Sequence, residues 1–91
     1  MSERLHCAVP GCRRTRKADP ELIVVEGVVI DLLEEWICGD HWRVVPHIWR
    51  RRNSLVKRRL RNQKTAKLAS LGGKIWARCK RDAIESAVGL K

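Results

Sequence analysis

The sequence contains neither phenylalanine nor tyrosine, and tryptophan occurs only four times in 91 residues. Aromatic side chains supply much of the apolar area that a small core buries. A chain of this length buries only about 60 to 65% of the surface that its unfolded form exposes. We therefore expect one domain, residues 1–91, without a second independent core, and a source of stability besides hydrophobic packing.

A long uninterrupted apolar run is also missing. The most apolar stretch, residues 22–38, is too short to span a bilayer and is interrupted by Glu26, Asp31, Glu34 and Glu35. The first twelve residues lack the apolar core that a secretory signal requires. These features predict a cytoplasmic protein with no membrane partner, in a compartment that keeps its four cysteines reduced.

Acidic residues are absent from residues 43–81, which contain fourteen basic ones, whereas residues 1–42 contain five basic and eight acidic residues. This change divides the chain into a head, residues 1–45, and a basic region, residues 46–91. The net charge of +10 exceeds what solubility requires and predicts a polyanionic partner.

Two pairs of metal-binding side chains, spaced Cys-x4-Cys and Cys-x2-His, are separated by 25 residues. Three thiolates and one imidazole form a complete tetrahedral zinc shell, and a shell without an open position is structural rather than catalytic. Pro10-Gly11 favours a tight turn inside the first pair. We therefore predict a structural Zn2+ bound by Cys7, Cys12, Cys38 and His41. Two alternatives are His6 as a ligand and ordinary buried thiols without metal.

Between the two pairs, residues 21–33 predict a β-hairpin, because β-branched runs flank Glu26-Gly27 at a position suited to a tight turn. Residues 38–45 begin as a helix that ends near Val45, since the next residue is proline. Pro46 suits the first turn of a second helix that runs to about Gln63. The fold class is therefore α+β.

The end of the chain predicts a last helix over residues 74–88, with Cys79 as a small core residue on its apolar side. Gly72-Gly73 is the most obvious helix breaker in the chain. Residues 64–71 either extend the second helix or form a separate short turn before that breaker. We interpret Trp42 and Trp76 as core anchors, and leave the role of Trp49 open.

A turn with two ligands, a hairpin and a helix start with two ligands follow one another in the order of a treble clef. The first cysteine pair, followed by Ile-Cys-x2-His-Trp-x2-Val-Pro over residues 37–46 and a basic stretch containing Trp49, resembles a family of small zinc proteins encoded by bacteriophages and prophages. The match covers residues 7–52, about half the chain. The resemblance implies a treble-clef zinc site on the same four residues, in a bacterial host cell. It implies no particular activity. The residue pattern itself predicts two basic helices after that site.

Motifs for catalysis are absent: we find no Ser/His/Asp or Cys/His pair at a workable spacing, no second metal set and no glycine-rich phosphate loop. HNH-type nucleases also use a treble clef, but they need a histidine at the hairpin, and residues 21–33 contain none. We therefore expect a protein that is not an enzyme, has no catalytic residues and takes no small-molecule substrate.

The basic region carries its cations without compensating carboxylates, and like charges four residues apart on a helix repel each other. Phosphates would relieve this repulsion. We therefore predict a phage regulatory or accessory factor that binds DNA or RNA along the phosphate backbone, through Arg50, Arg51, Arg52, Lys57, Arg58, Arg61, Lys64 and Lys67. The alternative is an adaptor or inhibitor that docks its basic surface on an acidic patch of a host polymerase or defence protein.

Overall fold

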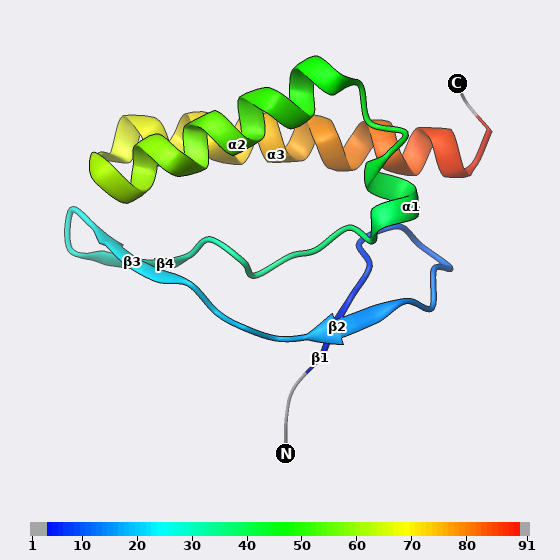
Figure 1. Cartoon of the computed structure of the whole chain (residues 1–91). Helices are drawn as coiled ribbons and strands as arrows, with labels where there is room; N and C mark the ends of the chain where they lie inside the picture. The colour runs from blue at the N-terminus through cyan, green and yellow to red at the C-terminus, as the bar shows by residue number, and fades with distance from the viewer. Residues whose placement is uncertain (1–3, 90–91) are drawn as a thin grey trace.

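Two long antiparallel helices lie over two short hairpins in the computed structural model, which describes residues 4–89 (Figure 1). The elements in chain order are β1 Arg4–His6, β2 Thr15–Lys17, β3 Leu22–Val25, β4 Val28–Asp31, α1 Gly39–Trp42, α2 His47–Asn62 and α3 Ala66–Ala87. The predicted α+β class is confirmed.

The predicted hairpin forms from β3 and β4, which pair antiparallel with Ile23 opposite Ile30. Its turn places Glu26 at φ 48° and Gly27 at φ 82°, the left-handed conformation that a two-residue hairpin turn requires. Along β3, Ile23 and Val25 are buried, and both pack in a small cluster with Leu60 of α2. Buried and exposed side chains therefore alternate along β3, and the buried ones pack the hairpin against the helical layer.

A second hairpin, β1–β2, was not predicted. Its strands have three residues each and pair Arg4 with Lys17 and His6 with Thr15. Strands this short, composed mainly of polar residues, contain no alternating apolar pattern from which to recognise them. Their connection contains the first two predicted metal ligands, so this hairpin is part of the site.

The chain leaves α1 at Trp42 and starts α2 at His47, with Pro46 as the residue that caps the new helix. The predicted interruption at Val45 is therefore confirmed, and α2 ends at Asn62, one residue before the expected end. Proline produces this interruption because its ring disfavours a helical conformation at the preceding residue.

The predicted break at Gly72-Gly73 is wrong, as are both predictions for residues 64–71: α3 begins at Ala66 and runs through the glycine pair to Ala87. The side chain of Thr65 caps its start by accepting a hydrogen bond from the Leu68 amide at 3.3 Å. A methyl group at Gly72 would lie 3.5 Å from Leu60 Cδ1 of α2. Close packing between the helices thus outweighs the low helix propensity of glycine, about 1 kcal/mol per residue.

The main core lies where the head meets both long helices. Its buried residues come from the two ligand segments of the head, from the turn before α2 and from both long helices; they are Cys7, Val9, Ile37, Cys38, Val45, Val56, Ile75, Cys79 and Ala83. Trp42 and Trp76 stack with ring centroids 6.0 Å apart and pack against this core, as predicted, and so does Trp49. Cys79 is fully buried, and its burial raises the pKa of the thiol.

Candidate metal centre and cationic surface

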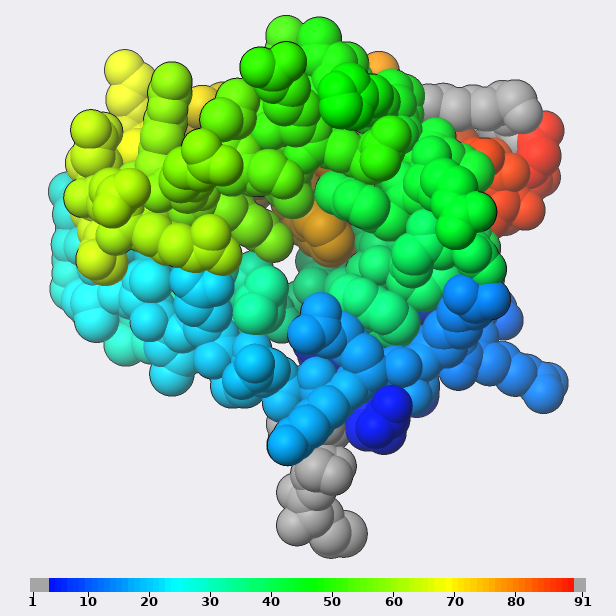
Figure 2. All heavy atoms as spheres, viewed as in Figure 1, coloured from blue at the N-terminus to red at the C-terminus, as the bar shows by residue number. Residues whose placement is uncertain are grey.

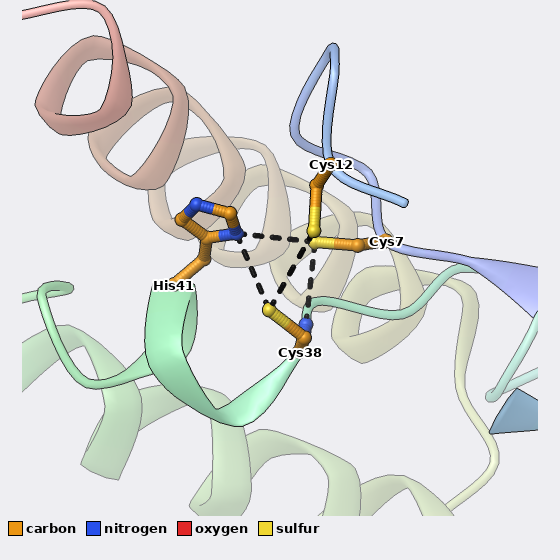
Figure 3. A group of neighbouring side chains, drawn as sticks. All are labelled: Cys7, Cys12, Cys38 and His41. Atoms are coloured by element: carbon orange, nitrogen blue, oxygen red, sulfur yellow. Dashed lines mark hydrogen bonds between the residues drawn. The ribbon is translucent and has the colours of Figure 1, made fainter. Parts of the chain in front are cut away.

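The four predicted metal ligands come together from two parts of the head (Figure 3). Cys7 directly follows β1 and Cys12 lies in the β1–β2 connection, whereas Cys38 caps the start of α1 and His41 lies within that helix. Figure 3 shows their sulfur atoms and the His41 ring nitrogen Nδ1 pointing toward one another.

All four ligand atoms lie within 4.8 Å of one another. Cys12 Sγ is 3.9 Å from Cys38 Sγ, and His41 Nδ1 is 3.5 Å from Cys7 Sγ and 3.2 Å from Cys38 Sγ. A tetrahedral zinc ion with bonds of about 2.0 to 2.3 Å would hold its ligand atoms about 3.5 to 3.8 Å apart. A disulfide needs about 2.05 Å. The cluster is therefore compatible with a metal ion and contains no disulfide.

Local hydrogen bonds hold the two ligand pairs together. The Cys12 amide bonds the Val9 carbonyl at 3.1 Å in a tight turn, and Gly11 in that turn has φ 84°. The Ala8 amide bonds the Trp36 carbonyl at 2.8 Å, and the Cys38 amide donates to Cys7 Sγ at 3.3 Å. These bonds bring the segment before α1 beside the first ligand turn.

The surroundings of the sulfurs set which thiol ionises more readily. Burial raises the pKa of Cys7. Burial also acts on Cys38, but its pKa is lowered overall, because the backbone N–H of His41 and the thiols of Cys7 and Cys12 favour the thiolate. A metal ion binds thiolates rather than thiols. Cys38 is thus the thiol of the cluster whose surroundings favour the thiolate, the form that binds a metal ion.

His6 does not belong to this cluster, and its side chain is exposed at the end of β1. The four residues predicted from the spacing are thus the ones that meet. The observation agrees with strand geometry, because consecutive residues point to opposite sides of a strand and Cys7 faces the interior.

Carboxylates of the head pair with cations on one side of the helical layer. Glu21 beside β3 forms a two-point ion pair with Arg61 of α2, with oxygen–nitrogen distances of 2.5 and 2.8 Å. Glu35 accepts hydrogen bonds from Lys80 Nζ at 3.0 Å and from the Trp76 indole at 3.0 Å. In Figure 2 the second half of α2 lies directly on the β3–β4 hairpin. We call this head-facing side of α2 and α3 the inner face.

Three of the predicted nucleic-acid ligands on α2 contact residues outside that helix. Arg61 pairs with Glu21, and Arg50 donates to the Val45 carbonyl at 3.0 Å. Lys57 Nζ lies 5.4 Å from the centroid of the Trp76 ring, and burial lowers the pKa of this lysine. The structure therefore does not bring the eight predicted residues together on one surface.

The other five predicted residues are exposed, and we refer to them with their unpredicted neighbours as the outward cations. Arg51 and Arg58 lie two turns apart on one face of α2. Arg52 stacks on Trp49 at 4.8 Å, while Lys64 and Lys67 lie where α2 passes into α3. The exposed cations of α2 and α3 that were not predicted are Arg59, Lys74 and Arg81. Arg59 lies seven residues after Arg52 and therefore on the same face of α2 as a predicted residue. This spacing is the signal in the sequence that could have identified Arg59.

Among residues 4–89, no helix is long and apolar enough to cross a membrane. Comparisons of the chain with protein-family models, with curated proteins and with solved structures found no match. The metal cluster and the distribution of charge over the helices are therefore the features that bear on function.

Proposed function

We propose that this protein is a zinc-stabilised nucleic-acid-binding protein, a phage regulatory or accessory factor that acts in the bacterial cytoplasm. The observation that carries the proposal is the pairing of inner-face cations with the head: Arg61 and Lys80 are neutralised by Glu21 and Glu35, whereas the outward cations are left facing solvent. A phosphate backbone is the polyanion that such a surface suits best, because each contact releases condensed counterions.

Arg51 and Arg58 are the central residues of the proposed interface. Both are exposed, and neither forms an ion pair with any residue in the described range 4–89. They are about 10.5 Å apart along the axis of α2. Long, unpaired arginines at this separation contact separate phosphates without any rearrangement of the core.

The proposed zinc acts on this interface from a distance. In comparable small domains the apparent free energy of zinc binding is about 10 to 16 kcal/mol, and it stabilises the folded form. Here the ion would join Cys7 and Cys12 to Cys38 and His41 and so hold α1 against the rest of the head. Buried Val45 and the cap at Pro46 then set where α2 starts and which way it points.

The test is a salt series of fluorescence anisotropy titrations with labelled duplex DNA, single-stranded DNA and RNA. If about six phosphates are contacted, the logarithm of the binding constant falls against the logarithm of salt concentration with a slope of about −5. The double variant Arg51→Gln/Arg58→Gln should weaken binding and make this slope shallower by about 2 units.

The control variant is Arg16→Gln/Lys17→Gln, which removes the same charge from exposed positions on β2. Its affinity and slope should stay near those of the wild type. A flat salt response with every nucleic acid, or an equal loss in both double variants, would reject the proposal.

A second candidate function, docking on an acidic host protein, is favoured by an apolar groove between the long helices.

A further inference from the structure

A groove of about 840 Å³ runs between α2 and α3 and is lined only by residues 49–59 and 68–81, with none from the head. Its apolar lining consists of Trp49, Leu55, Val56, Leu68, Leu71, Ile75 and Ala77. Leu55 is 39% exposed and Leu71 is 48% exposed, although each has the other helix beside it. The two helices therefore leave a strip of apolar surface uncovered between them.

The rim of this groove is entirely cationic. Its charged residues are Arg52, Arg59, Lys74, Arg78 and Arg81, and no lining residue is acidic. The guanidinium groups of Arg52 and Arg78 both lie over the Trp49 ring, each 4.8 Å from its centroid, and Arg78 also pairs with Asp82 at 3.2 Å. These contacts hold two of the cations at the edge of the apolar strip.

The groove has the length of a short helix. Its walls span ten residue steps of α2 and thirteen of α3, about 15 and 20 Å at 1.5 Å per residue. A second hollow of about 540 Å³ shares Arg59, Leu68 and Leu71 with the groove and extends it past Lys67 toward the turn between the helices. About three to four turns of a bound helix would fit along this surface.

We propose that the groove binds an acidic amphipathic helix of a partner protein. Apolar side chains at i, i+3, i+4 and i+7 of that helix would cover Leu55 and Leu71, while its flanking Asp and Glu residues would meet the rim cations. The complementary charge identifies the occupant. A second copy of this chain would bring two surfaces of a +10 protein together, and a phosphate backbone would leave the apolar strip uncovered.

Peptide binding in the groove does not depend on nucleic-acid binding, because Arg51 and Arg58, the central residues of the proposed nucleic-acid interface, do not line the groove. Four of the outward cations, Arg52, Arg59, Lys74 and Arg81, also border the groove, whereas Arg51 and Arg58 lie beside it on the neighbouring face of α2. One protein can therefore offer a phosphate-binding face and a peptide-binding groove on the same helix.

The probe is a panel of three dye-labelled 18-residue peptides with Glu-rich polar faces, whose apolar stripe is Leu, Phe or Met. A scrambled peptide of identical composition lacks the stripe. We expect at least one member of the panel to bind the full-length protein at least tenfold more tightly than its scrambled version. The double variant Leu55→Ser/Leu71→Ser should reduce that affinity at least tenfold, measured by anisotropy.

Leu22→Ser is the matched control, because Leu22 is 64% exposed on β3, away from the groove. It should bind the peptide like the wild type. Circular dichroism checks that each variant folds, and two single variants, Leu55→Ser and Leu71→Ser, replace the double variant if it does not. Arg51→Gln/Arg58→Gln should keep peptide binding even where it weakens nucleic-acid binding, so the two proposals can fail separately.

Four outcomes would overturn the inference. Equal binding of scrambled and striped peptides would reduce the interaction to charge attraction, and failure of every peptide in the panel to bind would leave the groove without the proposed occupant. A dimer in sedimentation that Leu71→Ser disrupts would make a second copy the occupant. Loss of nucleic-acid binding in Leu55→Ser/Leu71→Ser with unchanged peptide affinity would assign the groove to nucleic acid.

Discussion

Cys38 links the metal cluster to the helices, because its sulfur lies in the cluster and its backbone starts α1. It is 1% exposed, and its amide also donates to Cys7 Sγ. Loss of this one side chain therefore removes a donor atom and leaves the interior of the head with an incomplete ligand set.

We expect Cys38→Ser to lose the proposed zinc ion and to unfold the head, because a hydroxyl is a poor zinc ligand and metal binding contributes folding free energy. Nucleic-acid affinity should fall indirectly. Metal content of protein purified under mild conditions, together with thermal unfolding, measures both effects. Stoichiometric zinc in this variant would contradict the proposed site.

Cys79→Ala is the matched control for that experiment. Cys79 is as buried as Cys38 but lies on α3 outside the cluster, where its thiol faces the Trp49 carbonyl at 3.6 Å. The variant should bind one zinc ion per chain, with a loss of stability of about 1 kcal/mol from the small space it leaves. The two cysteines therefore separate loss of metal from loss of packing.

At the scale of elements, α3 is a single helix of 22 residues that passes through two adjacent glycines. The glycines differ in their surroundings. A Cβ added at Gly72 would meet Leu60 and Val56 of α2 at van der Waals distance, whereas one added at Gly73 would meet no atom within 4 Å. Only Gly72 therefore has a packing role in the contact between α2 and α3.

We expect Gly73→Ala to raise the free energy of unfolding by about 0.8 to 1 kcal/mol, because alanine has the higher helix propensity and the site is open. Gly72→Leu should lower it by about 1 to 3 kcal/mol, since the larger side chain would push α2 away from α3. Urea denaturation measures both. A destabilising Gly73→Ala would show that the glycine pair is needed as a flexible joint.

Over the whole molecule, the carboxylates of the acidic head neutralise part of the positive charge of the basic region. Carboxylates of the head lie against the inner face, where Glu21 and Glu35 pair with Arg61 and Lys80, and Glu26 accepts a hydrogen bond from the Ala66 amide at 2.7 Å. Repulsion along α2 is partly relieved inside the protein, and the remaining positive charge faces outward.

The ion pair between Glu21 and Arg61 makes the attachment of the head dependent on pH. The hydrogen bond from Arg61 lowers the pKa of Glu21 in the folded protein. The stabilisation is therefore fully present above the unfolded value of about 4.3 and is lost as pH falls through the folded pKa. Glu21→Gln should be less stable than the wild type at pH 7, and the two stabilities should converge well below pH 4.

Urea denaturation of both proteins at several pH values between 3 and 7 measures this difference. Glu34→Gln removes the same charge from an exposed position that has no ion pair within residues 4–89, so it should differ little from the wild type at pH 7. A stability difference between Glu21→Gln and the wild type that stays constant over this range would contradict a role for the ion pair.

The sequence by itself determined the parts that depend on local rules. The spacing of Cys7, Cys12, Cys38 and His41 identified the cluster, because a turn and a helix start place residues at fixed short separations. Glu26-Gly27 identified the turn between β3 and β4, and Pro46 identified the interruption before α2. In each case the backbone preference of one or two residues is enough.

Only the tertiary structure decided the rest, because it depends on contacts between distant residues. Gly72 remains helical because α2 packs on it, and β1–β2 forms around a cluster whose other half is more than twenty residues away. The same holds for the cations: Arg58 and Arg61 are indistinguishable in sequence, yet Glu21, forty residues from Arg61, pairs with one of them, and the other has no ion pair within residues 4–89. Folding thereby selects which charges are available to a partner.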